Sequence, residues 1–177
     1  MDILKRFVAI TDIEASGLDV AVHEIIEIGL VLVDQKTFEI IDTLDIKVRP
    51  EHLETASEFS LQLNGYNEKE WQNALSLQEA MVQYSEKTKD AVFCSQNITF
   101  DWSFISAAFK KAGTKDLMDY HRIDLFTMAW LKLKNSGLES FHLKDVARYL
   151  GVLEEPMPHR AMNGARTAYE IFKKLIS

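Results

Sequence analysis

The chain has 177 residues, of which 47% are hydrophobic, and it carries a formal net charge of -7 at pH 7. This length and composition suffice for one globular unit, and we expect residues 1–177 to form a single domain. The acidic balance argues against a broad basic surface for nucleic acid, but it permits a small site that grips a few nucleotides. With no run of about 18 apolar residues and only one cysteine, Cys94, we expect a soluble, cytoplasmic protein without a membrane partner.

The first part of the chain predicts three consecutive strands. Residues Phe7–Ile10 and Ile25–Val33 are almost continuously apolar, which is typical of strands covered on both faces. The third segment, Ile40–Val48, alternates instead, with every second residue from Leu44 to Val48 expected to face the core. This alternation is typical of an antiparallel edge strand. The polar stretch that follows, up to Lys89, is predicted to be helical.

Strands and helices alternate in the rest of the chain. We expect a strand at residues 91–94, a helix that ends at Gly113, a short strand at residues 122–123 and a helix from Leu125. Two further helices follow, the first ending at Gly151 and the second running to the C-terminus. Three strands followed by alternating helices and strands predict an α/β fold with a mixed sheet between helices.

Two carboxylates one residue apart follow the first apolar run. Because side chains alternate along a strand, Asp12 and Glu14 should point the same way, about 7 Å apart at the backbone, and could converge on Mg²⁺ or Mn²⁺. Asp101 opens a later helix, and His159 precedes the last one. Each residue also has an ordinary explanation: a solvated strand end, a helix-start acid favoured by the dipole, or a solvated loop histidine.

In this order the motifs resemble those of the DEDDh 3'-5' exonucleases, which include the proofreading subunits and domains of bacterial replicative DNA polymerases. The resemblance runs from about Phe7 to Leu175 and is carried by Asp12–Leu18, Ile25–Gly29, Asn97–Trp102 and Arg122–Asp124. It implies the ribonuclease H-like fold, in which a mixed five-stranded sheet is flanked by helices.

The resemblance also implies an activity, namely hydrolysis of the terminal phosphodiester bond at the 3' end of DNA or RNA with release of nucleoside 5'-monophosphates. Two ions of Mg²⁺ or Mn²⁺ would be held by Asp12, Glu14 and Asp101. His159 would take a proton from the attacking water. The implied partner is the 3' end of single-stranded or frayed nucleic acid, and a polymerase is a second candidate partner.

Four residues form the predicted substrate site. By resemblance, Leu18, Asn97 and Phe100 would line the pocket of the 3' nucleotide, where Leu18 could wedge against bases. Core packing is the rival explanation, above all for Phe100, which belongs to a helical apolar stripe. Ala15 belongs to the same predicted site, but Ala15 and Ser16 stand where the family usually has two threonines.

One implied metal ligand is missing. The family pattern places a fourth aspartate five residues after the histidine, and this chain has Gly164 there. We therefore expect a weakened or inactive relative, or a variant with that aspartate replaced. The alternative is a catalytically degenerate fold that binds nucleic-acid ends or a protein partner without turnover. Glu27, in the second strand, either orients the site or pairs with a basic side chain, and is not in the catalytic set.

Overall fold

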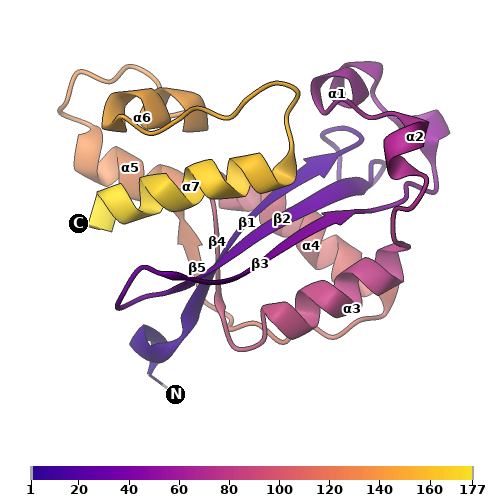
Figure 1. Ribbon diagram of the computed structural model, residues 1–177, viewed down its shortest axis with the longest axis horizontal. Helices are drawn as coiled ribbons and strands as arrows, with labels where there is room; N and C mark the ends of the chain where they lie inside the picture. The colour runs from indigo at the N-terminus through magenta and orange to yellow at the C-terminus, as the bar shows by residue number, and fades with distance from the viewer. Residues whose placement is uncertain (1, 177) are drawn as a thin grey trace.

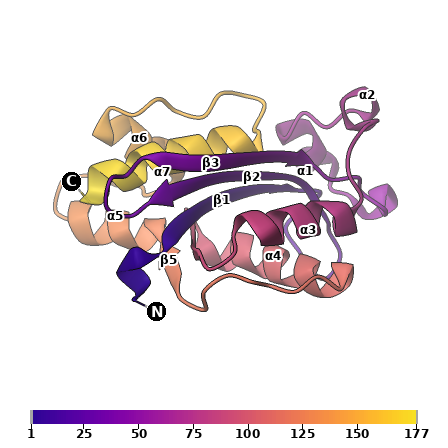
Figure 2. The ribbon, with the colours of Figure 1, turned by 60° about the horizontal axis from the view of Figure 1, so that its bottom comes forward.

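The computed structural model describes residues 2–176, which form a five-stranded sheet with helices on both faces (Figures 1 and 2). The strands are β1 (Phe7–Ala15), β2 (Ile25–Asp34), β3 (Ile40–Lys47), β4 (Val92–Ser95) and β5 (Arg122–Asp124). Their order in the sheet is β3-β2-β1-β4-β5; β1 to β3 are antiparallel, whereas β4 runs parallel to β1 and β5. The expected mixed five-stranded sheet of the ribonuclease H-like fold is confirmed.

The helices form two layers around this sheet. They are α1 (Glu58–Leu63), α2 (Glu68–Trp71), α3 (Leu77–Lys87), α4 (Ile98–Ala112), α5 (Leu125–Leu133), α6 (Leu143–Leu150) and α7 (Ala161–Ile176). Figure 2 shows α7 and α6 above the sheet and α3 and α4 below it. The helices α4 and α6 end as predicted at Gly113 and Gly151. Both glycines have a left-handed backbone conformation, which residues with a side chain adopt less readily. No helix within residues 2–176 is long and apolar enough to cross a bilayer.

The two faces of β1 pack into different cores. Ala9 and Ile13 belong to the apolar cluster that includes α3 and α4, whereas Val8 and Ile10 belong to the cluster that includes α5, α6 and α7. Because side chains alternate along a strand, the next even position, Asp12, falls on the α7 face, as does Glu14. The fold therefore presents both carboxylates toward the start of α7.

The first strand is longer than the apolar run predicted. It continues from Ile10 to Ala15 because β2 pairs with it along the whole length, as far as Ala15 opposite Ile25. On its other side, the ladder with β4 covers only Val8 to Ile10. Asp12 and Glu14 therefore lie within the strand, where one side of β1 is no longer covered by a neighbouring strand.

The remaining strand predictions agree with the structure. In the edge strand β3, Ile46 is buried, and Val48 just beyond it is buried as well. The central strand β2 is buried at nine of its ten positions, as expected of a strand covered on both faces. Cys94 is a buried free thiol in β4.

Candidate active site

The two acids of β1 are the first part of the site. Glu14 is 8% exposed, and Asp12 is partly exposed. Among the hydrogen bonds and ion pairs of residues 2–176, none involves either carboxylate. Carboxylates this deeply placed normally accept hydrogen bonds, so their lack of protein partners is unusual.

Asp101 reaches β1 from the first turn of α4. Its side chain is almost fully buried, and its Oδ1 accepts a hydrogen bond from the backbone N–H of Ile13 at 3.3 Å. This contact forms where β1 extends beyond its ladder with β4. Asp101 is thus the helix-start acid that its position predicted, and it is also directly joined to the strand segment between Asp12 and Glu14.

The segment before α7 brings His159 to the same end of the sheet, where Figure 1 shows the start of α7 close to α1. The backbone N–H of His159 donates to the carbonyl of Leu63 in α1 at 3.0 Å. Its Nδ1 lies 3.3 Å from Oε2 of Glu155, whose Oε1 accepts from the N–H of Arg160 at 3.0 Å. One carboxylate therefore holds two consecutive residues of this segment.

Sequence reasoning missed Glu155. It lies four residues before His159, but the segment between them is not a helix, so no regular periodicity brings the two side chains together. Only the folded path of the chain shows their contact.

Glu27 fixes the beginning of α7. This residue is 1% exposed, and its Oε1 accepts from Lys47 Nζ at 2.7 Å and from Arg160 Nη1 at 3.3 Å. Its Oε2 accepts a hydrogen bond from the N–H of Ala161 at 3.2 Å. The first N–H groups of a helix have no acceptor within the helix, and Glu27 provides one. Of the two roles left open for Glu27, pairing with basic side chains is confirmed.

Gly164 faces Asp12 across the short distance between α7 and β1. A Cβ atom on Gly164 would lie 2.4 Å from Asp12 Oδ2 and 2.7 Å from its Cγ. Position 164, where the family resemblance leads one to expect an aspartate, is therefore next to Asp12. In the present arrangement the carboxylate of Asp12 occupies the space that a side chain at 164 would enter.

Burial raises the pKa values of the acids at this site, and for Asp12 and Glu14 the charges of neighbouring acids add to the effect. Burial raises the pKa of Glu14 to about 8, and the negative charge of Glu155 acts in the same direction. Burial also raises the pKa of Asp101 to about 7, against the opposing effect of the Ile13 N–H. The pKa of Asp12 is well above its ordinary value because of desolvation and then the charge of Asp101. The site holds more acid than its own basic groups neutralise.

Three ligand atoms suited to a metal come together at one point of this site. In the part of the chain that the structure describes, Glu14, Glu155 and His159 each offer an atom within 4.8 Å of the others. A second set with the same property is Glu24, Glu51 and His52. Asp12 and Asp101 belong to neither set. Asp12 is nevertheless close to Glu14 along β1, and Asp101 is hydrogen-bonded to Ile13, which precedes Glu14.

The predicted substrate residues differ in exposure. Leu18 is 81% exposed and Asn97 is exposed, so both are accessible to a ligand. Phe100 is half-buried, with its ring 5.0 Å from that of Phe104, which suits packing as well as a pocket. Ala15 is buried, and its carbonyl accepts from Asn64 Nδ2 at 3.0 Å. These four residues therefore do not form one open surface.

Phe59 is an exposed aromatic residue that sequence reasoning did not select. It is 72% exposed in α1, two residues after Ser57, whose N–H donates to the carbonyl of Ser16 at 2.7 Å. This hydrogen bond holds the start of α1 against the end of β1. Aromatic side chains so exposed can stack on bases, but its position in the chain gave no signal of that kind.

A known protein family matches most of the chain. The family model described as Exonuclease (RNase T) matches residues 9–172. The chain belongs to this exonuclease family. Its resemblance to the DEDDh 3'-5' exonucleases, carried by the ordered acids and the histidine, is confirmed.

Relatives of this exonuclease-family chain include much longer proteins. A DNA polymerase III PolC-type protein of Caldanaerobacter subterraneus subsp. tengcongensis is 32% identical over 165 residues, which cover 93% of this chain and 11% of that protein. A 3'-5' exonuclease DinG of Staphylococcus aureus is 29% identical over 178 residues, which cover 94% of this chain and 18% of that protein. The chain thus spans less than a fifth of the length of either relative.

Solved structures of other exonucleases share the fold. The nuclease domain of 3'hExo, a DEDDh family member bound to rAMP, gives a TM-score of 0.79 at 20% identity and covers 99% of this chain and 94% of that one. E. coli exonuclease I in complex with a dT13 oligonucleotide also gives 0.79, at 16% identity, and covers 97% of this chain and 41% of that one. At these identities the likeness shows the arrangement of the sheet and helices.

Proposed function

We propose that this chain is a metal-dependent 3'-5' exonuclease of low activity that removes nucleotides from the 3' end of a nucleic-acid strand. The observation that carries the proposal is the meeting of Asp12, Glu14 and Asp101 with His159 at one end of β1. Family membership supports the reaction class, and relatives named as DNA polymerases favour DNA as the substrate and a polymerase as a partner.

The donor set fits a divalent cation. Glu14 is buried and accepts no hydrogen bond within residues 2–176, and its pKa is raised by this burial and then by the acids around it. Hard cations such as Mg²⁺ and Mn²⁺ prefer carboxylate oxygens, which Asp12, Glu14 and Asp101 would provide. When bound, such a cation supplies charge stabilisation to the phosphate oxygens and activates water. We expect binding to be weak because Gly164 offers no carboxylate.

The protein's own groups would perform the proton transfer and hold the strand end. His159 has its Nδ1 beside Glu155, which leaves Nε2 as the nitrogen able to accept a proton from water. The contact of its backbone with Leu63 keeps the residue at the site. Leu18 lies shortly after Glu14 in the sequence and Asn97 shortly before Asp101. Both side chains are exposed and would contact the terminal nucleotides.

The test is the release of mononucleotides from a 3'-labelled single strand in Mn²⁺ or Mg²⁺. The unchanged chain is compared with Gly164→Asp and with the double variant Asp12→Asn, Glu14→Gln. We expect slow release by the unchanged chain, at least about tenfold faster release by Gly164→Asp, since one ligand is restored, and none by the double variant. If neither the unchanged chain nor Gly164→Asp cuts, the exonuclease proposal is wrong. If both cut equally, our account of the missing ligand is wrong.

Gly164 also favours a second candidate, a module that binds strand ends or a protein partner without turnover. This candidate requires binding of the same labelled strand in the presence of a chelator. Unchanged binding by the double variant Asp12→Asn, Glu14→Gln, together with no cleavage by any variant, would favour the module over the enzyme.

A further inference from the structure

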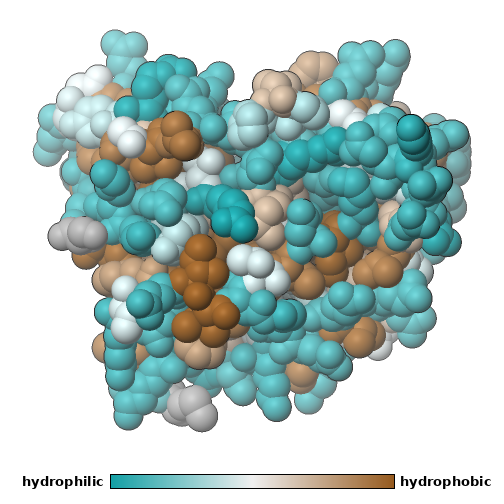
Figure 3. All heavy atoms as spheres, viewed as in Figure 1, coloured by the Kyte–Doolittle hydropathy of each residue, from teal (hydrophilic) through white to brown (hydrophobic). Residues whose placement is uncertain are grey.

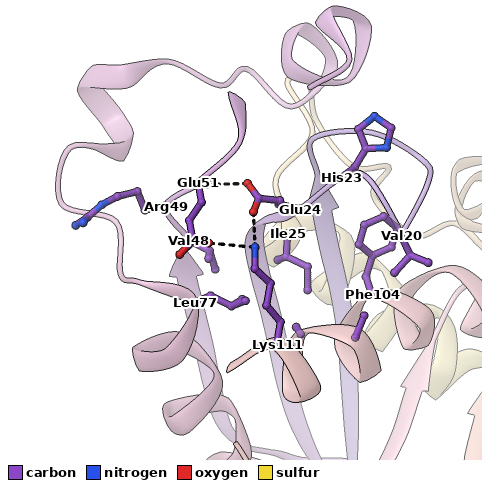
Figure 4. A pocket seen from close by; sticks show the side chains of 12 residues that line it. Val20, His23, Glu24, Ile25, Val48, Arg49, Glu51, Leu77, Phe104 and Lys111 are labelled. Atoms are coloured by element: carbon purple, nitrogen blue, oxygen red, sulfur yellow. Dashed lines mark hydrogen bonds and ion pairs between the residues drawn. The ribbon is translucent and has the colours of Figure 1, made fainter. Parts of the chain in front are cut away.

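The two sets of metal-suited side chains differ in how their charges are already satisfied. In the second set, Lys111 Nζ lies 2.7 Å from Glu24 Oε1 and 3.1 Å from Glu51 Oε2. Figure 4 marks both ion pairs with dashed lines. The other oxygen of Glu24 accepts from the backbone N–H groups of Glu51 and His52. This group borders a cavity of about 210 Å³ and needs no cation, because a lysine and two backbone donors already satisfy it.

The first set has no such neutralising partner. Glu14 has neither a hydrogen bond nor an ion pair within the described residues, and its carboxylate is directed at Glu155 and His159. The side chain of Glu155 is 10% exposed and contacts only the Arg160 N–H and His159 Nδ1 in that part of the chain. Neither carboxylate forms an ion pair with lysine or arginine there. Burying two such groups is unfavourable unless a positive charge lies between them.

Glu155 is held in a position to act as a ligand. The N–H that it accepts belongs to Arg160, whose guanidinium donates to Glu27 at 3.3 Å and to Glu70 at 2.8 Å. Arg160 also donates to the carbonyl of Asn64 at 2.9 Å. A carboxylate has about four lone-pair sites, so one hydrogen bond and one ion-pair contact leave lone pairs of Glu155 free to bind a cation.

We propose that Glu155 supplies the carboxylate that position 164 lacks, so that Glu14 and Glu155 hold a divalent cation beside Asp12. The inference rests on the proposed function and deepens it by naming a ligand outside the family pattern. Residue 164 lies on α7, whereas Glu155 approaches from the segment that leads into α7. The two positions therefore reach the acids of β1 from neighbouring parts of the chain.

The experiment measures Mn²⁺ binding to the full chain by isothermal titration calorimetry, without nucleic acid and without an activity readout. Glu155→Gln keeps the size and polarity of the side chain, and we expect it to weaken Mn²⁺ binding by about tenfold or more. The matched control is Glu154→Gln, because Glu154 is adjacent, its side chain is 40% exposed, and it pairs with Arg148. The control should change the affinity by less than about twofold.

A double variant tests whether the two carboxylates are interchangeable. Adding Gly164→Asp to Glu155→Gln should restore Mn²⁺ binding to at least the level of the unchanged chain. If Gly164→Asp alone binds Mn²⁺ but does not restore Glu155→Gln, Glu155 does not substitute for position 164 and the inference is overturned.

Two further outcomes separate this inference from the proposed function. Unchanged affinity in Glu155→Gln, with binding lost in Glu14→Gln, overturns the role of Glu155 and leaves the exonuclease proposal standing. No Mn²⁺ binding by any variant, Gly164→Asp included, contradicts the metal-dependent function itself. Circular dichroism checks that each variant is folded. Glu155→Ala is a second variant, and unchanged Mn²⁺ affinity in either Glu155→Gln or Glu155→Ala, when folded, overturns the inference.

Discussion

Individual side chains at the site fall into two kinds, those with partners and those without. Glu27 is fully buried and satisfied by Lys47, Arg160 and the first N–H of α7. Glu14 is almost as buried and has no such contact among residues 2–176. Both are glutamates on neighbouring strands, paired directly opposite each other in the ladder. Their different surroundings separate a structural carboxylate from one suited to a ligand.

Replacement of Glu27 by glutamine should destabilise the protein. The substitution removes the charge between Lys47 and Arg160 and weakens the acceptor at the start of α7, so we expect a loss of about 2 kcal/mol in the free energy of unfolding. Chemical denaturation of the chelator-treated protein measures this loss.

The matched control for Glu27 is Glu70→Gln. Glu70 contacts the same guanidinium of Arg160 at 2.8 Å, but its side chain is 48% exposed. Exposed ion pairs contribute little, so this change should lower the free energy of unfolding by clearly less than Glu27→Gln does. Equal losses in the two variants would show that the burial of Glu27 does not matter.

At the scale of secondary-structure elements, the position of α7 decides where the site residues lie. Gly29 in β2 allows this helix to approach the sheet closely, because a Cβ there would lie 2.2 Å from the backbone carbonyl atoms of Ala161. The same turn of α7 follows His159 and Arg160 directly. Close contact between β2 and α7 therefore also fixes the distance between His159 and the acids of β1.

Gly29→Ala should displace the first turn of α7. We expect a loss of about 1–3 kcal/mol in the free energy of unfolding, as for other overpacked cores, and weaker Mn²⁺ binding. Ala161→Gly should not rescue the variant, since the contacted atoms of residue 161 belong to its backbone. Denaturation and calorimetry measure the two effects, and rescue by Ala161→Gly would contradict this explanation.

Most elements were predictable because each depends on local periodicity. The buried strand β2, the edge strand β3 and the glycine ends of α4 and α6 all follow from apolar spacing and backbone preference. For β1 the apolar pattern stops at Ile10, and the expectation that Asp12 and Glu14 point the same way already treated them as strand residues; the structure continues the strand to Ala15. Pairing with β2, a contact between distant parts of the sequence, keeps that segment extended.

The location of the candidate site was predictable to the same limit. The order of acids and the histidine indicated four residues, which the fold places near one end of β1, and their catalytic roles stay predictions. Contacts made by irregular segments were missed, as with Glu155 and the exposed Phe59 on its short helix. No periodic pattern links such residues to their partners, so only the tertiary structure identifies them.

On the face of the molecule shown in Figure 3, the surface is largely hydrophilic and apolar side chains gather in small patches. The formal net charge is -7, and part of this acidity is concentrated beside β1 instead of being spread over the surface. Buried acids of this kind connect the global stability to pH, because the folded and unfolded chains bind protons with different affinity.

In the presence of a chelator, stability should fall as the pH rises from about 5 to about 8. Glu14 has a pKa of 4.5 when unfolded and about 8 when folded, and that of Asp101 rises from 3.8 to about 7. Below the pKa values of the unfolded chain, both acids are protonated in the folded and the unfolded state. At higher pH the unfolded chain loses these protons first, which lowers its free energy relative to the folded chain. The loss is on the order of a few kcal/mol, measured by denaturation at both pH values.

Glu14→Gln is the control for this pH dependence, because glutamine does not titrate. Its stability should vary less between pH 5 and pH 8 than that of the unchanged chain, and Mn²⁺ should raise the stability of the unchanged chain at pH 8. The same pH dependence in both proteins would remove Glu14 as its source.

The contact between Gly164 and Asp12 links the identity of one residue to the orientation of the other. When residue 164 has no side chain, the carboxylate of Asp12 fills the space beside it. A side chain at residue 164 would meet this carboxylate, which is the end of a flexible side chain and can rotate away. The residue at position 164 therefore decides which way the carboxylate of Asp12 points.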